Sequence, residues 1–298
     1  MRLPAAVLFY LLLLPPVPAV SSAADPVPDA DYPPAIEELT IVSEGARMPG
    51  LIYLANGEGP HPTVVLLHGF PGNEKNLDLA QALRRVGFNV LFFHYRGAWG
   101  SEGSYSVRQL DDDTLAALAF LRDPANAKKY RVDTAYLSLL GHSLGGFTAL
   151  AAGSRDGGVA CVGAMAPANL GLWKAGFAKG DPLGDRLFAY ADGLFMLENF
   201  DGAVMRKEMQ SASLDELDTR RFGPGLRGKS VLMIVGEKDT VTTPEAMFQP
   251  VVDAYESVEG LRLEHHIIPG DHSFSWSRLL LTQLVLDWLE RDCRRPPD

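Results

Sequence analysis

Cysteine and positive charge are both scarce in this chain of 298 residues. Its two cysteines are too few for a disulfide-rich fold or for a zinc site with four thiolate ligands. Lysine and arginine together number 27 against 37 acidic residues, so the net charge is −10 at pH 7. Nucleic acid and anionic membranes attract proteins that have a positive surface. We therefore expect neither of them as a partner.

The first 24 residues have the pattern of a secretory signal peptide. Arg2 precedes an apolar run from Ala5 to Leu14, and a proline-rich stretch and the small residues Ser21–Ala24 follow it. The alternative is a membrane anchor, but about ten residues in a helix reach only about 15 Å, half of a bilayer core. We expect residues 1–24 to be cleaved and the mature protein to be secreted or periplasmic, with no stable membrane insertion.

Export would place Cys161 and Cys293 in an oxidising compartment, where disulfides form. Cys161 lies in an apolar, strand-like segment, whereas Cys293 lies in the C-terminal tail. The sequence leaves open whether the two pair. It favours the simpler interpretation that Cys161 is a small, buried, apolar residue.

Strand and helix patterns alternate after a proline-rich and acidic lead-in over residues 25–34. Strand patterns occupy eight segments: Leu39–Val42, Leu51–Leu54, Thr63–His68, Asn89–Tyr95, Ala135–Leu140, Val159–Ala166, Ser230–Val235 and Leu261–Ile268. Helical patterns occupy five: Leu77–Val86, Gln109–Leu121, Leu144–Ser154, Glu245–Ser257 and Ser277–Arg291. Runs such as Val231–Val235 are continuously apolar, which is typical of parallel strands covered on both faces. The order predicts an α/β fold with a mostly parallel sheet of about eight strands flanked by helices.

One segment interrupts this alternation. Residues 168–228 contain no clear strand, and they are too many for a connecting loop. We expect them to form a small helical cap over one end of the sheet, inserted into a single domain that spans residues 25–298.

Gly141–Gly145 has the pattern G-x-S-x-G, with Ser143 at its centre. The serine directly follows an apolar strand and directly precedes a helical pattern, and this strand–turn–helix setting is the one that the motif requires. The turn is tight enough to need glycine on both sides. It raises the Ser143 hydroxyl above the carboxyl ends of the strands, where ligands bind in open α/β sheets. We predict that Ser143 is a nucleophile.

A serine nucleophile needs a base, and the base needs an acid that orients it. Asp239 and His272 each lie just past a predicted strand, and they follow Ser143 in the chain order serine, acid, histidine. Asp271 and Glu237 are the alternative acids. The other histidines considered as the base are less well placed; they are His61, His94, His265 and His266.

The remaining parts of such a site are backbone donors for an oxyanion. Leu144 offers its N–H at the start of a helix, and the second donor of this arrangement comes from the loop after the third strand, here Phe70. None of the seven histidines forms an H-E-x-x-H or similar pair. We expect no metal and no organic cofactor.

These residues resemble those of the α/β-hydrolase superfamily from about Glu38 to Arg291. More narrowly, the motifs are similar to those of dienelactone-hydrolase-like and prolyl-oligopeptidase-like serine hydrolases. They are His68-Gly69-Phe70, His94–Gly97 with Gly100, Gly141–Gly145, Asp239 and His272. The chain departs from these families at three points. We expect no propeller domain, because few residues precede the first apolar strand. Phe70 stands where the peptidases have a tyrosine, and Ser143 stands where the dienelactone hydrolases have a cysteine.

Three functions follow as hypotheses. The first is an exported serine hydrolase that cleaves carboxylic esters through an acyl-enzyme intermediate. The second is an exported peptidase for short peptides, with Glu198 or Asp201 of the cap as an anchor for the amine. The third is a noncatalytic binding module. Several apolar residues of the cap could line an acyl pocket or form the cap's own core: Trp173, Phe177, Phe188, Phe195 and Met196. The expected substrate is a small-molecule or peptide acyl compound, and the oligomeric state stays open.

Overall fold

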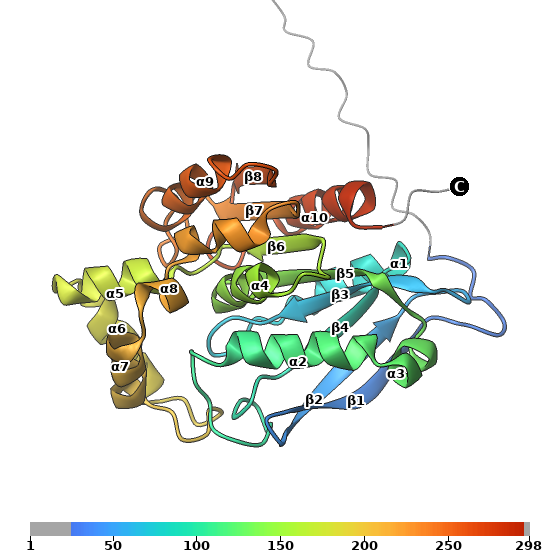
Figure 1. Cartoon of the computed structure of the whole chain (residues 1–298), viewed down its shortest axis with the longest axis horizontal. Coiled ribbons are helices and arrows are strands. Elements are labelled where there is room, and N and C mark those ends of the chain that lie inside the picture. The colour runs from blue at the N-terminus through green and yellow to red at the C-terminus, as the bar shows by residue number, and fades with distance from the viewer. Residues whose placement is uncertain (1–24, 295–298) are drawn as a thin grey trace, which may run out of the picture.

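A single eight-stranded sheet forms the centre of the computed structural model, which describes residues 25–294 (Figure 1). The strands lie in the order β1-β2-β4-β3-β5-β6-β7-β8. Their bounds are β1 (Ala35–Ser43), β2 (Ala46–Leu54), β3 (His61–Leu67), β4 (Asn89–Phe93), β5 (Val132–His142), β6 (Cys161–Met165), β7 (Ser230–Gly236) and β8 (Arg262–Ile268). Strand β2 is antiparallel to β1 and β4, and all other neighbours are parallel. The predicted α/β class and the mostly parallel sheet are confirmed. The predicted signal peptide lies outside the described residues.

Helices cover both faces of the sheet, so the central strands β4, β6 and β7 are buried along their whole length. Helices α1 (Leu77–Arg85) and α10 (Arg278–Asp292) pack into the core on one face. Helices α2 (Leu110–Arg122), α4 (Leu144–Arg155) and α9 (Gln249–Glu256) pack into the core on the other, with the π-helical turn η2 (Pro244–Phe248) directly before α9. These helices match the five predicted segments. The short α3 (Pro124–Lys129) has no counterpart in the prediction.

The segment between β6 and β7 is helical and stands beside one end of the sheet (Figure 1). It contains α5 (Leu170–Ala178), α6 (Pro182–Ala191), α7 (Gly202–Ser211), α8 (Leu214–Leu217) and the 3₁₀ helix η1 (Thr219–Leu226). Asn169, Asp181 and Asp201 start α5, α6 and α7, because the side chain of each accepts a hydrogen bond from a backbone N–H in the first turn. We call residues 168–228 the cap. Among the described residues no helix is long and apolar enough to cross a membrane.

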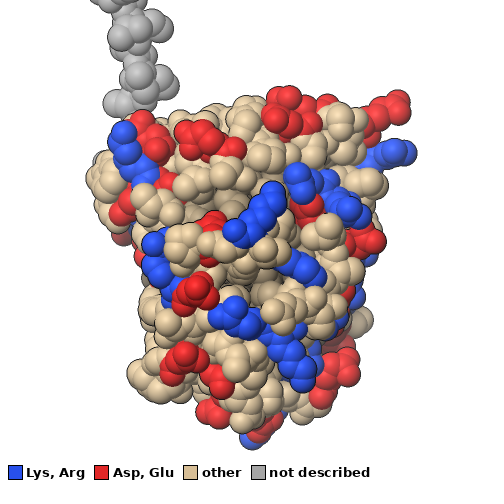
Figure 2. Space-filling view, turned by 90° about the vertical axis from the view of Figure 1, so that its left-hand side faces the viewer, with Lys and Arg blue, Asp and Glu red and all other residues tan. Residues whose placement is uncertain are grey.

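Figure 2 shows the cap side of the molecule, where Lys and Arg side chains gather around a hollow in the middle of the face. Several basic side chains of the cap and its surroundings are paired with acids. Arg108, an exposed residue just before α2, lies 2.5 Å from Glu216 of α8, and Arg221 lies 2.5 Å from Asp215. The first of these pairs joins the cap to the segment before α2. Because both partners of each pair are partly exposed, each pair adds little stability by itself.

Cys161 and Cys293 form a disulfide, with their Cα atoms 5.8 Å apart. The interpretation of Cys161 as an unpaired buried residue was therefore wrong. The reason is the path of α10, which returns to the sheet beside β6: the ring of Trp288 packs so closely on Gly163 that a Cβ there would lie 3.2 Å from it. The last turn of α10 thereby brings Cys293 to Cys161. The bond connects residues 132 positions apart in the sequence.

Removing this disulfide should lower the stability of the fold. A cross-link across so long a loop reduces the freedom of the unfolded chain, and losing it costs about 2–5 kcal/mol of unfolding free energy. We expect Cys293→Ala to lower the melting temperature by about 5–10 °C in differential scanning calorimetry. Cys161→Ala and the double variant should behave similarly, because each removes the same bond. A shift below about 1 °C would contradict the assignment.

Candidate active site

Ser143 occupies a sharp turn between β5 and α4. Its φ of 58° and ψ of −119° lie in a region that residues other than glycine rarely adopt. The neighbouring glycines are needed because backbone groups come too close for a side chain. A Cβ at Gly141 would lie 1.9 Å from the Gly145 carbonyl oxygen, and a Cβ at Gly145 would lie 2.2 Å from the Leu67 carbonyl oxygen. The motif therefore packs the turn directly against the end of β3.

The three predicted residues Ser143, Asp239 and His272 form one hydrogen-bonded chain. His272 Nε2 lies 3.0 Å from Ser143 Oγ, and His272 Nδ1 lies 2.7 Å from Asp239 Oδ2. Each residue follows a strand of the parallel part of the sheet: β5, β7 and β8, respectively. Their meeting follows from the topology, because the carboxyl ends of parallel strands lie along one edge.

Asp239 is buried, with only 3% of its surface exposed. Its Oδ1 accepts hydrogen bonds from the backbone N–H groups of Val241 and Thr242, and its Oδ2 accepts one from the Thr242 hydroxyl at 2.7 Å. Burial favours the neutral acid, but the hydrogen bonds from His272 and Thr242 outweigh it, so the pKa of Asp239 lies below its ordinary value. The carboxylate is thus ionised at neutral pH and fixes the His272 ring. Thr242 was not identified from the sequence.

The alternative residues have other surroundings. Asp271 accepts hydrogen bonds from the backbone N–H groups of Ser273 and Ser275, and Glu237 is exposed. Among the rival histidines, His266 contacts Glu264. His61 is half-buried, and its ring contacts the Gly57 carbonyl. None of these side chains lines the cavity at Ser143.

Ser143 opens into a cavity of about 190 Å³ between the sheet edge and the cap. The predicted oxyanion donors Phe70 and Leu144 both line it, as does His272. The other lining residues are Val107, Leu170, Trp173, Leu187, Tyr190, Met205 and Val241. No Asp, Glu, Lys or Arg is among them. The cavity is therefore suited to an uncharged, largely apolar group held next to the Ser143 hydroxyl.

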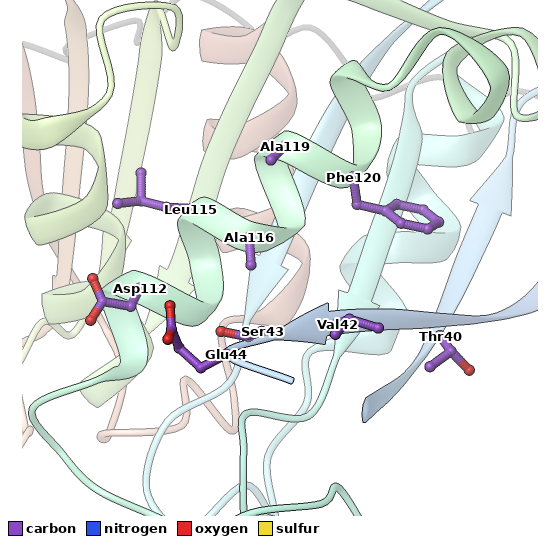
Figure 3. A pocket seen from close by; sticks show the side chains of 9 residues that line it. All are labelled: Thr40, Val42, Ser43, Glu44, Asp112, Leu115, Ala116, Ala119 and Phe120. Atoms are coloured by element: carbon purple, nitrogen blue, oxygen red, sulfur yellow. The ribbon is translucent and has the colours of Figure 1, made fainter. Parts of the chain in front are cut away.

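Larger hollows lie away from this chain of residues. Figure 3 shows one of them, a groove of about 810 Å³ between β1 and α2, lined on one side by Thr40 and Val42 and on the other by Ala116 and Phe120. None of Ser143, Asp239 and His272 contributes to it. Within residues 25–294, no cluster of three or more His, Cys, Asp or Glu side chains is arranged to hold a metal ion.

Only one of the cap residues proposed from the sequence to bind substrate lines the cavity. Of the five apolar candidates, Trp173 lines the cavity, whereas Phe177 and Phe188 pack on each other with ring centroids 5.4 Å apart. Phe195 is 90% exposed and Met196 is half-buried outside the cavity. Neither Glu198 nor Asp201 lines the cavity; Asp201 caps α7. Four cap residues that line it were not identified from the sequence: Leu170, Leu187, Tyr190 and Met205. On α5 and α6 the signal is a spacing of three residues, Leu170 with Trp173 and Leu187 with Tyr190, whereas Met205 stands alone on α7.

A sequence model of the alpha/beta hydrolase family matches residues 64–279, more than two thirds of the chain. The chain belongs to the alpha/beta hydrolase family. This confirms the resemblance to the α/β-hydrolase superfamily and agrees with the observed sheet. The match spans the serine turn, the two other members of the hydrogen-bonded chain and the cap.

Curated relatives of this alpha/beta hydrolase match only part of it. It is 31% identical over 131 residues to an uncharacterized protein of Mycobacterium tuberculosis, covering 43% of this chain and 45% of the relative. It is 30% identical over 131 residues to the esterase EstD of Thermotoga maritima, covering 40% and 30%. It is 32% identical over 96 residues to the lysophosphatidylserine lipase ABHD12 of Danio rerio, covering 31% and 23%. The matched regions thus span less than half the length of these relatives.

Solved structures with the same fold are more distant in sequence. The esterase Pf2001 of Pyrococcus furiosus superposes with a TM-score of 0.68 at 18% identity, over 89% of this chain and 93% of that one. An acylaminoacyl peptidase of Pyrococcus horikoshii superposes with a TM-score of 0.65 at 15% identity, over 89% and 42%. Est1E from Butyrivibrio proteoclasticus gives 0.58 at 16%, over 85% and 98%. These likenesses show the fold alone.

Three other histidines near the site are neutral at pH 7. Burial lowers the pKa of His68 to about 4 and that of His142 to about 3. Burial, together with the neighbouring His68 ring and the positive charge of Lys75, lowers the pKa of His94 to about 3. His142 Nε2 donates a hydrogen bond of 2.7 Å to the carbonyl oxygen of His272, so it supports the loop that carries that ring.

These histidines should make the fold sensitive to mild acid. Their pKa values are lower in the folded protein than the ordinary value of 6.5, so the unfolded chain takes up protons first as the pH falls below 6.5. The contribution of these histidines to the free energy of unfolding is fully present above this pH, and it is lost as the pH is lowered towards about 4. Each histidine contributes about 1.4 kcal/mol per pH unit in that window. Urea unfolding at pH 7, 6 and 5 measures the slope, which His142→Asn should reduce. A urea midpoint that is constant over this range would contradict the prediction.

Proposed function

We propose that this alpha/beta hydrolase is an exported serine hydrolase that cleaves carboxylic esters. The observation that carries the proposal is the hydrogen-bonded chain Ser143–His272–Asp239, which opens into an apolar cavity without a charged side chain. A buried carboxylate that orients an imidazole, which in turn contacts a serine hydroxyl, is the arrangement that activates serine for acyl transfer. The relative EstD of Thermotoga maritima is an esterase, which agrees with this proposal.

The proposed reaction has two halves. Ser143 Oγ attacks the ester carbonyl carbon while its proton passes to His272 Nε2, and the Phe70 and Leu144 N–H groups stabilise the resulting oxyanion. The C–O bond then breaks, and His272 gives its proton to the departing alcohol. Water attacks the acyl-serine with His272 as the base. The acid leaves, and the proton returns to Ser143. Asp239 keeps the ring oriented and stabilises its positive charge throughout.

An ester fits the cavity better than a peptide. A peptidase that trims short peptides needs a charged or strongly polar group to bind the free amine, and the two cap acids considered for this lie outside the lining. The ring of Phe70 has no hydroxyl to add to the oxyanion site. The noncatalytic hypothesis is disfavoured because a serine in a strained turn, a base and a buried acid are all in contact.

Export rests on two observations. Residues 1–24 have the composition of a signal peptide, and a buried disulfide joins β6 to the end of α10. Disulfides persist in secreted and periplasmic proteins and are rare in reducing cytoplasm. Both observations support a periplasmic or secreted protein.

Ser143→Ala should abolish turnover. The nucleophile is lost, so kcat/KM on a nitrophenyl butyrate should fall by at least about 10³-fold, while the melting temperature changes by a few degrees at most. Ser154→Ala, at the other end of α4, is the matched control and should keep full activity. The wild type should cleave an aminoacyl nitroanilide far more slowly than the ester. Equal rates on the two substrates would favour the peptidase, and activity in Ser143→Ala would refute the mechanism.

The cavity volume predicts a preference for short acyl chains. The cavity volume of about 190 Å³ lies below the range of about 300–1,000 Å³ that is typical of small-molecule sites. We expect kcat/KM to be higher for nitrophenyl butyrate than for the dodecanoate. Leu187→Ala should enlarge the cavity and shift the optimum to longer chains. The matched control is Leu183→Ala, one turn earlier on α6 and outside the lining. An unchanged profile in Leu187→Ala would place the acyl group elsewhere.

A further inference from the structure

Two loops meet beside Ser143. We call residues 68–72, after β3, the oxyanion loop, and residues 94–105, after β4, the β4 loop. Side chains, rather than backbone groups, satisfy three carbonyl groups of the oxyanion loop. Tyr95 donates its hydroxyl to the His68 oxygen at 3.3 Å, and Trp99 donates Nε1–H to the Pro71 oxygen at 2.7 Å. The Gly69 oxygen accepts from the His68 ring, at 2.8 Å from Nδ1.

The hydrogen-bond partners fix where the protons lie on His68 and His94. The Gly69 carbonyl oxygen can only accept, so His68 Nδ1 carries a hydrogen. His68 is buried and neutral, so its Nε2 is bare and can only accept. His94 Nδ1 lies 3.3 Å from that nitrogen and must therefore carry a hydrogen. A directed chain results: His94 donates to His68, and His68 donates to the Gly69 carbonyl.

This chain ends on the peptide unit that matters for catalysis. The Gly69 carbonyl and the Phe70 N–H belong to the same planar peptide group, so fixing one fixes the direction of the other. The same stretch lies directly against the nucleophile: a Cβ on Gly69 would be 2.9 Å from Ser143 Cβ and 3.4 Å from Ser143 Oγ. A small rotation of this peptide would move the Phe70 N–H relative to the reacting carbonyl.

We propose that His94 is a positioning residue for the oxyanion site: by donating to His68, it fixes the Gly69–Phe70 peptide and so aims the Phe70 N–H. The proposal rests on the serine-hydrolase function proposed above. His94 does not touch the Ser143 cavity and acts through His68. Its own position is set by the β4 loop, because the Ser101 hydroxyl donates to the His94 carbonyl at 2.8 Å and the Trp99 ring stacks on the His94 ring at 5.8 Å.

Three substitutions of His94 distinguish the effect of its hydrogen bond on catalysis from the effect of its packing. His94→Phe keeps a ring for the stack with Trp99 but has no donor, and His94→Leu also has no donor. His94→Asn retains an N–H donor near the position of Nδ1. Losing a whole oxyanion donor costs about 10²–10³ in kcat, and loss of its alignment should cost less. We expect kcat on nitrophenyl butyrate to fall about 10- to 100-fold in His94→Phe and His94→Leu, with KM within about twofold. His94→Asn should recover most of the loss.

The matched control is His61→Phe. His61 is also a partly buried histidine that contacts a carbonyl, but it lies at the opposite end of β3 from the oxyanion loop. Its replacement should lower the melting temperature without lowering kcat. If His94→Phe and His61→Phe lose kcat equally, His94 has only a structural role.

A pair of ketone inhibitors tests the stabilisation of the oxyanion directly. A trifluoromethyl ketone adds to the serine and forms an oxyanion, whereas the matching methyl ketone binds mainly without addition. His94→Phe should weaken inhibition by the trifluoromethyl ketone by about the same factor as kcat/KM and leave the methyl ketone unchanged. Equal weakening of both inhibitors by His94→Phe, or a wild-type kcat in that variant, would overturn the proposal about His94. If Ser143→Ala is inactive in the same assays, the proposed serine-hydrolase function is unaffected by that result. Activity in Ser143→Ala would overturn the proposed function, and this inference with it.

Discussion

The site depends on holding Ser143 in a backbone conformation that it would not adopt by itself. A non-glycine residue at a φ of 58° is strained, and such strain persists only where the surroundings fix the backbone. Here the Ser143 N–H donates to the Met165 carbonyl at the end of β6, and the Ser143 carbonyl accepts from Phe147 in α4 and Ala168 at the start of the cap. The serine turn is thereby tied to the next strand, its own helix and the cap at once.

The cap and the oxyanion loop are supported by a common element. The β4 loop contacts the oxyanion loop through Tyr95 and Trp99, and it also pairs with the cap backbone. The Trp99 N–H donates to the Met196 carbonyl, and the Glu198 N–H donates to the Gly97 carbonyl. The β4 loop therefore supports both the cap over the cavity and the oxyanion loop.

Much of this arrangement could be predicted from the sequence, because the informative residues stand directly after apolar strands. The positions of Ser143, Asp239 and His272 follow from that rule and from their order in the chain. Thr242 was missed, since a threonine three residues after an aspartate is also common in ordinary turns. The cavity lining was mostly missed as well. On short cap helices, apolar residues such as Leu187 and Phe188 have the same pattern whether they face the cavity or the cap's own core.

The pairing of the cysteines could not be read from the sequence for a different reason. It depends on the path of the C-terminal helix across the sheet, and local patterns do not specify that path. Cys161 is buried, as expected, but it is bonded to Cys293 and is not a free thiol. Tertiary contacts such as Trp288 against Gly163 bring the two thiols together.

The disulfide also has a consequence for how the molecule would respond to a break in its chain. Ser143 precedes Cys161, whereas Asp239 and His272 lie between Cys161 and Cys293, beyond the cap. A protease that cut the exposed turn at Lys179–Gly180 would place Ser143 on one fragment and Asp239 and His272 on the other, but each fragment would keep one cysteine of the bond. The two parts of the site would stay joined in one covalent molecule, with their relative positions still set by the sheet.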